Sequence, residues 1–233
     1  MPQKQVSALK DFISLFFPHV CLGCQKSLPK GLDFLCAQCL LDLPKTENHL
    51  VAIPGFEQKF TGLIAYEEVL VYLHFHKQGL VQKLLHALKY QDKQELGVYL
   101  GQLYGQELME AGYADRYDIV VPVPLHPKKL KQRGFNQSEA LAEGLANVLE
   151  LECLPDAVHR LRANPTQTRK SRLERLENVD ELFQVTDNQM IKGKRVLLVD
   201  DVLTTGATLL SCGHALHKAE PAALSFGLLA STK

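Results

Sequence analysis

The sequence lacks the features that direct a whole protein to a membrane or a polyanion. It has 26 Lys and Arg against 26 Asp and Glu, so its formal net charge is zero and any anion binding must come from local patches. It has no run of about 18 apolar residues, and Pro18 interrupts the apolar stretch 12–20, which no small-residue cleavage site follows. We therefore expect a cytoplasmic protein without membrane insertion.

The sequence also lacks internal repeats and low-complexity tracts. Its 233 residues, 46% of them hydrophobic and 22% charged, are typical of a globular protein with one main domain and a small appendage. We expect an N-terminal helix and cysteine module over 1–45, a linker over 46–60 and a main domain over 61–233.

Four of the six cysteines form two Cys-x-x-Cys pairs, Cys21 with Cys24 and Cys36 with Cys39. Two such pairs facing each other supply four thiolates for a tetrahedral Zn²⁺ ion, with no position left for a catalytic water. A structural zinc would stabilise a segment too short to bury a core. The alternatives are disulfides, which a reducing cytoplasm disfavours, and a redox pair, which needs only one Cys-x-x-Cys.

Strand and helix patterns alternate along the main domain. Continuous apolar runs such as "VLLV" are typical of strands covered on both faces, so the alternation predicts an α/β domain with a mainly parallel sheet. We expect paired strands over 60–73, further strands over 117–122, 183–185, 195–199 and 223–232, and helices over 79–109 (two), 138–150 and 207–218.

The stretch "RVLLVDDVLTTGATLL" (195–210) carries the strongest functional signal. Ligands of parallel sheets bind beyond the carboxyl ends of the strands, where Asp200 and Asp201 are expected. The turn that follows leads into a helix whose first amide groups lack intrahelical acceptors, and Gly206 lets the backbone approach an anion closely. These features predict a phosphate-binding loop.

The two acids beside this loop restrict the ligand. Carboxylates repel a bare polyanion, but they accept hydrogen bonds from ribose hydroxyls or hold Mg²⁺ that bridges other phosphates. The expected ligand is a sugar with a phosphate at one end and a metal-bound group elsewhere. Neither the Gly-Lys-Ser/Thr of a P-loop nor a dinucleotide glycine fingerprint is present.

"VLLVDDVLTTGATL" resembles the motif that binds 5-phosphoribosyl 1-pyrophosphate (PRPP) in type I phosphoribosyltransferases. The resemblance implies that fold, with Asp200 and Asp201 holding the ribose 2- and 3-hydroxyls in a catalytic site. It also implies that the 5-phosphate is wrapped by Thr204, Thr205, Gly206, Ala207 and Thr208.

Two further stretches, 118–142 and 164–183, resemble signatures of the competence protein F (ComF/GntX) family, which also carries a four-cysteine zinc module. The resemblance spans nearly the whole chain. It implies a type I phosphoribosyltransferase fold with a zinc ribbon-like module, and a role in natural competence, DNA uptake and transformation. Single-stranded DNA and competence-machinery proteins are the partners it suggests, and the oligomeric state is not indicated.

Two basic segments complete the expected site. In phosphoribosyltransferases the loop corresponding to 125–137 binds pyrophosphate, for which His126, Lys128, Lys129 and Arg133 supply donors; the alternative for the lysines is the solvated start of a basic helix. The segment 160–175, with Arg169 as a catalytic candidate, occupies the place of a mobile catalytic hood, or is a patch for nucleic-acid phosphates. Lys89-Tyr90 also matches the family, without an assigned role.

Three functions remain open from the sequence. The first is Mg²⁺-dependent transfer of phosphoribose from PRPP to a nitrogen nucleophile, with release of pyrophosphate, although no acceptor site is recognisable. The second is a non-catalytic protein that binds single-stranded DNA. The third is a nucleotide-sensing regulator that uses the same fold without turnover.

Overall fold

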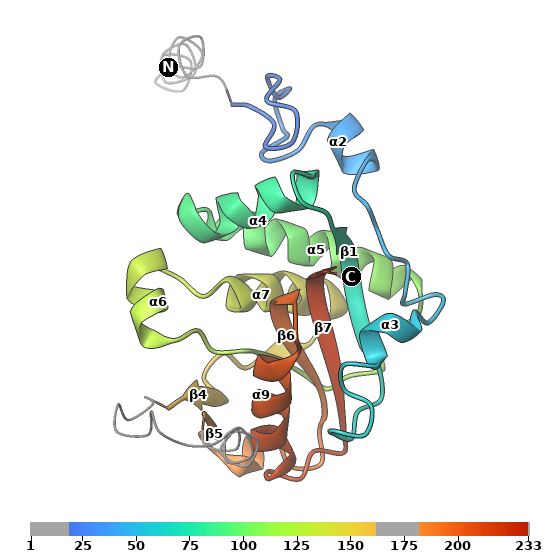
Figure 1. Cartoon of the computed structure of the whole chain (residues 1–233), viewed down its shortest axis with the longest axis vertical. Helices are drawn as coiled ribbons and strands as arrows, with labels where there is room; N and C mark the ends of the chain where they lie inside the picture. Colours follow the sequence, from blue (N-terminus) through green and yellow to red (C-terminus); the bar gives the residue numbers. More distant parts are fainter. Residues whose placement is uncertain (1–18, 162–181, 233) are drawn as a thin grey trace, which may run out of the picture.

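The computed structural model describes residues 19–161 and 182–232. Its centre is a five-stranded, wholly parallel sheet, as predicted, with strand order β1-β7-β6-β2-β3 (Figure 1). The helix expected near the N-terminus and the hood segment around Arg169 lie outside the described residues. The strands of the sheet are β1 (Val69–Phe75), β2 (Ile119–Pro122), β3 (Glu152–Cys153), β6 (Arg195–Leu203) and β7 (Ala223–Thr232).

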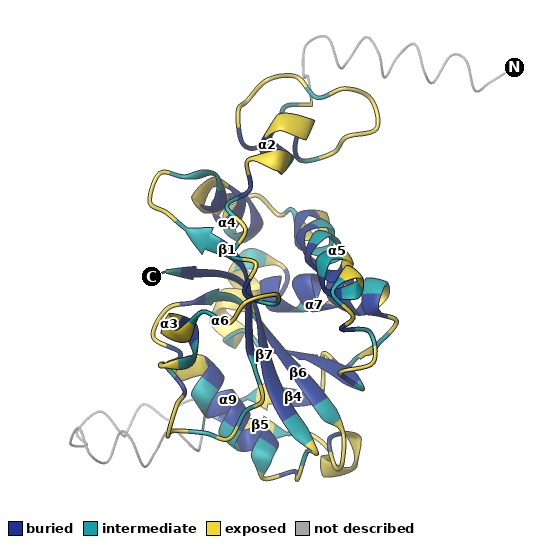
Figure 2. Ribbon diagram, turned by 90° about the vertical axis from the view of Figure 1, so that its right-hand side faces the viewer, coloured by how far each residue is buried: buried dark blue, intermediate teal, exposed yellow. Residues whose placement is uncertain are grey.

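Each face of the sheet has its own hydrophobic core. On β6, Leu197 and Val199 belong to one core, and Val196 and Leu198 belong to the other, because successive side chains of a strand point to opposite faces. This is the physical reason for the unbroken "VLLV" run, and Figure 2 shows the central strands as mostly buried along their length. The first core includes α4 (Leu80–Tyr90), α5 (Gln94–Glu110) and α7 (Gln137–Leu149), and the second includes α3 (Pro54–Glu57) and α9 (Ala207–His217).

The helices α5 and α7 pack with their backbones almost in contact, because glycines face each other at the crossing. A Cβ atom added to Gly101 would lie 2.2 Å from the carbonyl oxygen of Leu141, and one added to Gly144 would lie 2.1 Å from that of Val98. This close approach holds α7 against the sheet beside the end of β6.

The prediction of paired strands over 60–73 is wrong. Only β1 is a strand, and its partner is the last strand of the chain, β7, so no local hairpin forms. The residues before it form α3 and a series of turns. The aromatic residues that suggested a strand pack as a buried cluster instead, with the Phe60 ring stacked on Phe226 at a centroid distance of 4.5 Å.

The segment 44–48 runs along the outer edge of β1. The amide of Thr46 donates to the carbonyl of Tyr72, and the Asn48 side chain bonds both the carbonyl of Val69 and the amide of Val71. These bonds satisfy backbone groups that an edge strand would otherwise expose.

The remaining elements are short. They are α2 (Ala37–Leu41), α6 (Pro127–Arg133), the 3₁₀ helix η3 (Asn188–Met190), and the antiparallel pair β4 (Val158–Arg160) and β5 (Phe183–Val185). No helix in the described ranges combines the length and apolar character needed to cross a membrane.

Candidate functional site

Two adjacent acids lie near the carboxyl end of β6. The strand extends to Leu203 rather than ending at 199, so Asp200 and Asp201 are its sixth and seventh residues. One oxygen of Asp200, Oδ1, accepts hydrogen bonds from the Ser138 hydroxyl and from the Asp201 amide, both at 2.8 Å. Asp201 forms an ion pair with Lys89, whose Nζ lies 2.6 Å from Oδ2. Each acid is therefore fixed in place with one carboxylate oxygen left for a ligand.

Burial raises the pKa of Asp200 to about 7, and the charge of Asp201 adds to this effect. The hydrogen bonds from Ser138 and from the Asp201 amide, together with the charge of Lys89, act in the opposite direction. Near neutral pH, Asp200 is thus divided between its charged and neutral forms. A ligand hydroxyl that donates a hydrogen bond to the free oxygen of Asp200 favours the charged form of Asp200.

The loop after β6 presents backbone amides at the start of α9. Gly206 is the N-cap, with φ of +80°, and has no side chain to cap the helix; the Ala207 amide donates to the Thr205 hydroxyl at 3.4 Å. The first amides of α9 therefore have no intrahelical acceptor, which is the arrangement that binds phosphate groups. Lys59 donates to the carbonyl of Thr204 and, at 3.3 Å, to that of Thr232, so it ties this loop to the end of β7.

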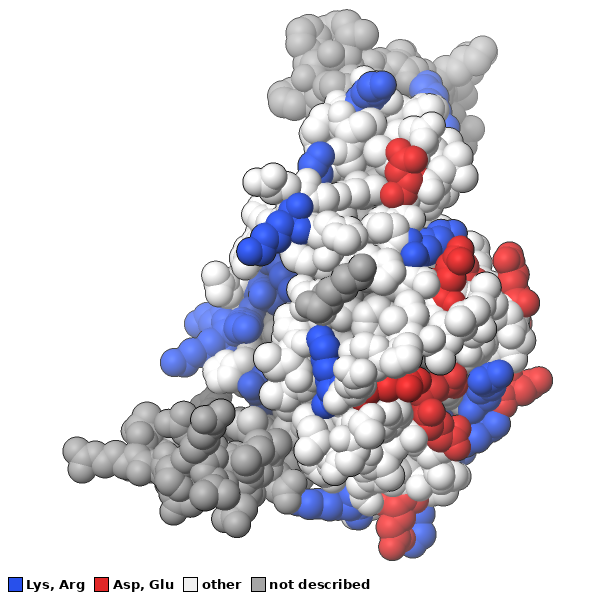
Figure 3. Space-filling view, turned by 45° about the vertical axis from the view of Figure 1, so that its right-hand side comes forward, with Lys and Arg blue, Asp and Glu red and all other residues white. Residues whose placement is uncertain are grey.

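A cavity of about 250 Å³ connects the acids with the loop. Four cationic side chains and the two acids contribute to it, so its lining carries a net positive charge that suits an anionic ligand. Figure 3 shows that Lys and Arg side chains gather along one side of the molecule despite its zero net charge. The polar lining residues are Lys89, Lys129, Arg133, Gln137, Ser138, Arg160, Asp200, Asp201, Thr204 and Thr208.

The structure brings together only part of the set expected from the sequence. The cavity lining includes both acids, Thr204, Thr208, Lys129 and Arg133, whereas Thr205, Gly206 and Ala207 lie in the adjoining loop. Residues 127–133 form α6, of which Lys129 and Arg133 line the cavity, whereas Lys128 and the N-cap residue His126 are not part of the lining. His126 caps this helix, and its Nδ1 accepts the amide of Lys128 at 3.1 Å.

Sequence reasoning missed four residues that shape the site: Lys89, Ser138, Arg160 and Lys59. The sequence marks Lys89 only as part of a string that matches the family, without a role, and Ser138 only as the start of a predicted helix. Arg160 lay in the basic segment, where it was not distinguished from its neighbours. Nothing in the sequence signalled Lys59, whose partners are more than 140 residues away.

The four N-terminal cysteines form a separate cluster. Their sulfur atoms all lie within 4.8 Å of one another, and those of Cys24 and Cys36 are 3.8 Å apart. Zn–S bonds of about 2.3 Å at tetrahedral angles place sulfur atoms about 3.8 Å apart, so this donor set fits the ion. All four are free thiols rather than disulfides, as expected for a cluster that could hold a metal such as zinc.

Comparisons with known proteins agree with this arrangement. A family model described as the phosphoribosyl transferase domain matches residues 136–232, which run from the start of α7 through both acids and the loop to the end of β7. The DNA utilization protein YhgH of Escherichia coli (strain K12) is 30% identical over 206 residues, covering 85% of this chain and 84% of that protein.

Two proteins named for competence are also similar. Competence protein F of Haemophilus influenzae is 26% identical over 204 residues, covering 85% of this chain and 84% of that protein. Competence protein ComFC of Bacillus subtilis is 36% identical over 118 residues, covering 48% of this chain and 44% of that protein. With its parallel sheet, its acid pair and its four clustered cysteines, this chain belongs to the competence protein F family of the phosphoribosyltransferase superfamily.

Proposed function

We propose that this protein binds PRPP, or a related phosphorylated ribose, in the cavity at the end of β6 and acts in DNA uptake. The observation that carries the proposal is the placement of two anchored carboxylates in one cationic cavity, beside a loop whose helix amides lack intrahelical acceptors. A ribose with a 5-phosphate needs both kinds of group at once: acceptors for its diol, and donors for its phosphate.

Each part of PRPP has a matching part of the cavity. The 2- and 3-hydroxyls would donate to the oxygens of Asp200 and Asp201 that Ser138 and Lys89 do not use. The 5-phosphate would accept hydrogen bonds from the amides and hydroxyls of residues 204–208. The 1-pyrophosphate would take the cationic side, where Lys129, Arg133 and Arg160 line the cavity.

Arg133 is held in position for this role. Its Nη1 donates to Oε1 of the buried Gln137 at 2.6 Å, so the guanidinium keeps further N–H groups for an anion. Lys128, His126 and Arg169 stay proposals from the family resemblance alone, since Lys128 and His126 are not among the lining residues and Arg169 is outside the described ranges.

The site is suited to Mg²⁺ that arrives with the ligand. The free carboxylate oxygens of the acid pair are ligands that Mg²⁺ accepts, and the ion would neutralise part of the pyrophosphate charge. The charge of Lys89 already neutralises that of Asp201, so the two acids alone do not form a fully anionic metal site.

If turnover occurs, the reaction is transfer of the phosphoribosyl group. The bond between ribose C1 and the pyrophosphate oxygen breaks, the pyrophosphate leaves with the electron pair, and a nitrogen nucleophile bonds to C1. Preorganised cations near the leaving group lower the barrier because charge develops there in the transition state. In this chain Lys129, Arg133 and Arg160 would have this role.

The names of the similar proteins are the basis for proposing a role in DNA uptake. Three similar proteins carry names that refer to competence or to DNA utilization. In this proposal, the phosphoribosyltransferase-like domain acts on PRPP or a nucleotide during uptake of DNA, and the cysteine cluster holds a structural zinc. A DNA-binding protein without turnover is the alternative that the same names allow.

Isothermal titration with PRPP and Mg²⁺ tests the binding. We expect binding by the unmodified protein and a loss of at least about a hundredfold when both acids are replaced by Ala, because two charge-assisted hydrogen bonds are removed. The matched control is Asp118→Asn, which should bind PRPP normally at neutral pH, because Asp118 lies just before β2 and pairs with Arg195 at the start of β6, away from the acid pair. Heat of binding that does not depend on Asp200 and Asp201 would refute the proposal.

A further inference from the structure

One aromatic side chain stands out beside the cavity. Tyr90 is 62% exposed, and it is the only large aromatic residue exposed to this extent within the described ranges. It ends α4 and directly follows Lys89, whose ammonium reaches into the cavity to pair with Asp201. The Arg133 guanidinium, which lines the cavity, lies 5.9 Å from the centre of the Tyr90 ring. The ring is therefore at the rim of the cavity.

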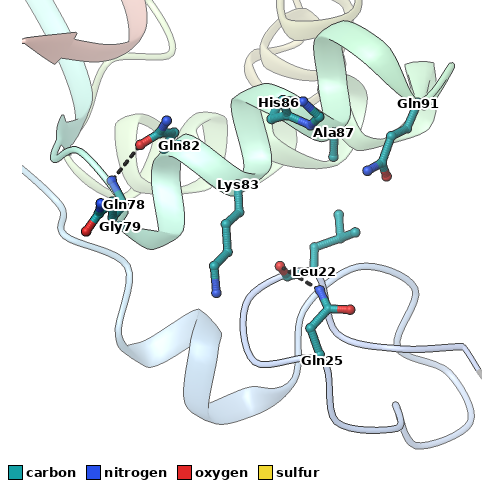
Figure 4. A pocket seen from close by; sticks show the side chains of 9 residues that line it. All are labelled: Leu22, Gln25, Gln78, Gly79, Gln82, Lys83, His86, Ala87 and Gln91. Atoms are coloured by element: carbon teal, nitrogen blue, oxygen red, sulfur yellow. Dashed lines mark hydrogen bonds between the residues drawn. The ribbon is translucent and has the colours of Figure 1, made fainter.

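The same helix leads from Tyr90 into a second cavity. The His86 ring, one turn before Tyr90, lies 4.9 Å from it between centroids. His86 and Gln91 line a cleft of about 530 Å³ between α4 and the cysteine module (Figure 4). Lys83 bonds the carbonyl of Gly23 across this cleft at 2.6 Å and so ties the module to α4.

The cleft has both apolar and polar walls. Leu22, Gly79 and Ala87 line it together with four glutamines, Lys83 and His86, and no carboxylate is among the lining residues. Amides both donate and accept hydrogen bonds, as the edges of nucleobases do, while Lys and protonated His attract phosphate. The polar side chains that line it are Gln25, Gln78, Gln82, Lys83, His86 and Gln91.

We infer that the exposed ring of Tyr90, flanked by His86 and Arg133, is a stacking site for a nucleobase that carries a phosphate. The base lies on the Tyr90 ring, its phosphate faces Arg133, and further polar parts of the ligand enter the amide-lined cleft. Stacking platforms of this kind are sequence-tolerant, because every base offers a flat face. An exposed ring beside the Arg133 guanidinium and the His86 ring, with no acid lining the neighbouring cleft, is complementary to such a ligand in both shape and charge.

The ligand has two sources with the same chemistry: a free nucleotide, or a nucleotide unit of a single strand. His86 and Gln91, on either side of Tyr90 in the sequence, line the cleft, and its other α4 residues extend back to Gly79, so a chain stacked on Tyr90 would continue along α4, which favours the strand. This inference takes from the proposed function only the idea that the protein handles DNA. It does not require that PRPP bind in the neighbouring cavity.

The absence of tryptophan from the chain allows a direct test. Tyr90→Trp introduces a single indole, whose fluorescence is quenched when a base stacks on it. Leu50→Trp is the matched control, since Leu50 is 63% exposed but lies beside Glu107 and Glu110, away from α4. Both variants are titrated with a short oligothymidylate and, separately, with thymidine 5′-monophosphate.

We expect saturable quenching of the Tyr90→Trp variant and none of the Leu50→Trp variant. Quenching by the oligonucleotide alone identifies a single strand as the ligand, and quenching by the mononucleotide as well identifies a site that also takes a free nucleotide. No quenching by either probe, or equal quenching of both variants, overturns the inference.

Affinity measurements complete the test. In fluorescence anisotropy with a labelled oligothymidylate, Tyr90→Ala should weaken binding about tenfold, whereas Tyr90→Phe, which keeps the ring, should bind as the unmodified protein does. Equal affinity of Tyr90→Ala and the unmodified protein would overturn the inference. PRPP binding by the unmodified protein is measured separately, so failure of the PRPP site and failure of the stacking site are distinguishable.

Discussion

Replacing Asp200 by Asn should stabilise the protein, and the gain should depend on pH. Asn keeps an Oδ1 atom that accepts both existing hydrogen bonds, from Ser138 and from the amide of residue 201, but it carries no charge. The pKa of Asp200 is about 7 in the folded protein, against the ordinary value of 3.8 that we expect after unfolding. This difference of about three pH units corresponds to about 4 kcal/mol.

The sign follows from proton counting. Between pH 4 and pH 7 the folded protein keeps the proton of Asp200 and the unfolded chain has lost it, so the free energy of unfolding falls as pH rises. Above pH 7 Asp200 is charged in the folded protein, and burial of this charge lowers the free energy of unfolding by the full amount of about 4 kcal/mol. The advantage of Asp200→Asn is therefore near zero at pH 4, grows through pH 7 and then stays constant at about 4 kcal/mol, which is roughly 10 °C in Tm for a chain of this size.

Thermal unfolding followed by circular dichroism from pH 4 to pH 8.5 measures this gain. The quantity of interest is the difference between variant and unmodified protein, because any effect of pH on the cysteine cluster is common to both. Asp118→Asn is a control of opposite sign: Arg195 holds the pKa of Asp118 at about 2, so removing that charge should lower stability above pH 4. Parallel curves for Asp200→Asn and the unmodified protein would refute the reasoning.

Three further changes should have measurable effects. Gly101→Ala should cost at least about 3 kcal/mol in urea unfolding, because its Cβ would meet a backbone oxygen at 2.2 Å, whereas Gly55→Ala, with open space around it, should change little. Gly206→Ala should cost about 1–2 kcal/mol and weaken PRPP binding in titration, because Ala is strained at φ of +80° and its Cβ would crowd Phe60 at 3.2 Å. Cys24→Ser should reduce the zinc content measured by mass spectrometry from one ion per chain to near zero; full zinc occupancy would contradict the four-thiolate site.

Local patterns predicted the parallel sheet and the turn between the acid pair and the next helix well. The strand, the acid pair, the turn and the following helix are consecutive in the chain, so one stretch of sequence contains the whole arrangement. The run "VLLV" indicated two covered faces because a strand alternates its side chains between them, and the structure has a separate core on each face.

Contacts between distant segments were not predictable in the same way. The pairing of Lys89 with Asp201 depends on where α4 lies relative to the end of β6, and the bond from Ser138 to Asp200 depends on the close packing of α7. These positions follow from the strand order and from the glycines between α5 and α7, which no local periodicity encodes.

The differences in secondary structure have local physical causes. The segment 60–68 has the aromatic composition of a strand, but its rings form a cluster on β7, and the partner of β1 comes from the end of the chain. After β2 the sequence left two alternatives, a pyrophosphate-binding loop or the start of a basic helix; Pro127 at the first helical position and His126 as N-cap begin a helix there.

The most direct test of the PRPP site is a crystal structure of the protein with PRPP and Mg²⁺ bound. It should show the ribose 2- and 3-hydroxyls within about 3 Å of the Asp200 and Asp201 carboxylates, and the 5-phosphate on the amides of residues 205–208. Density for the ligand away from β6, or for a ribose whose hydroxyls face the cationic side of the cavity, would contradict the account.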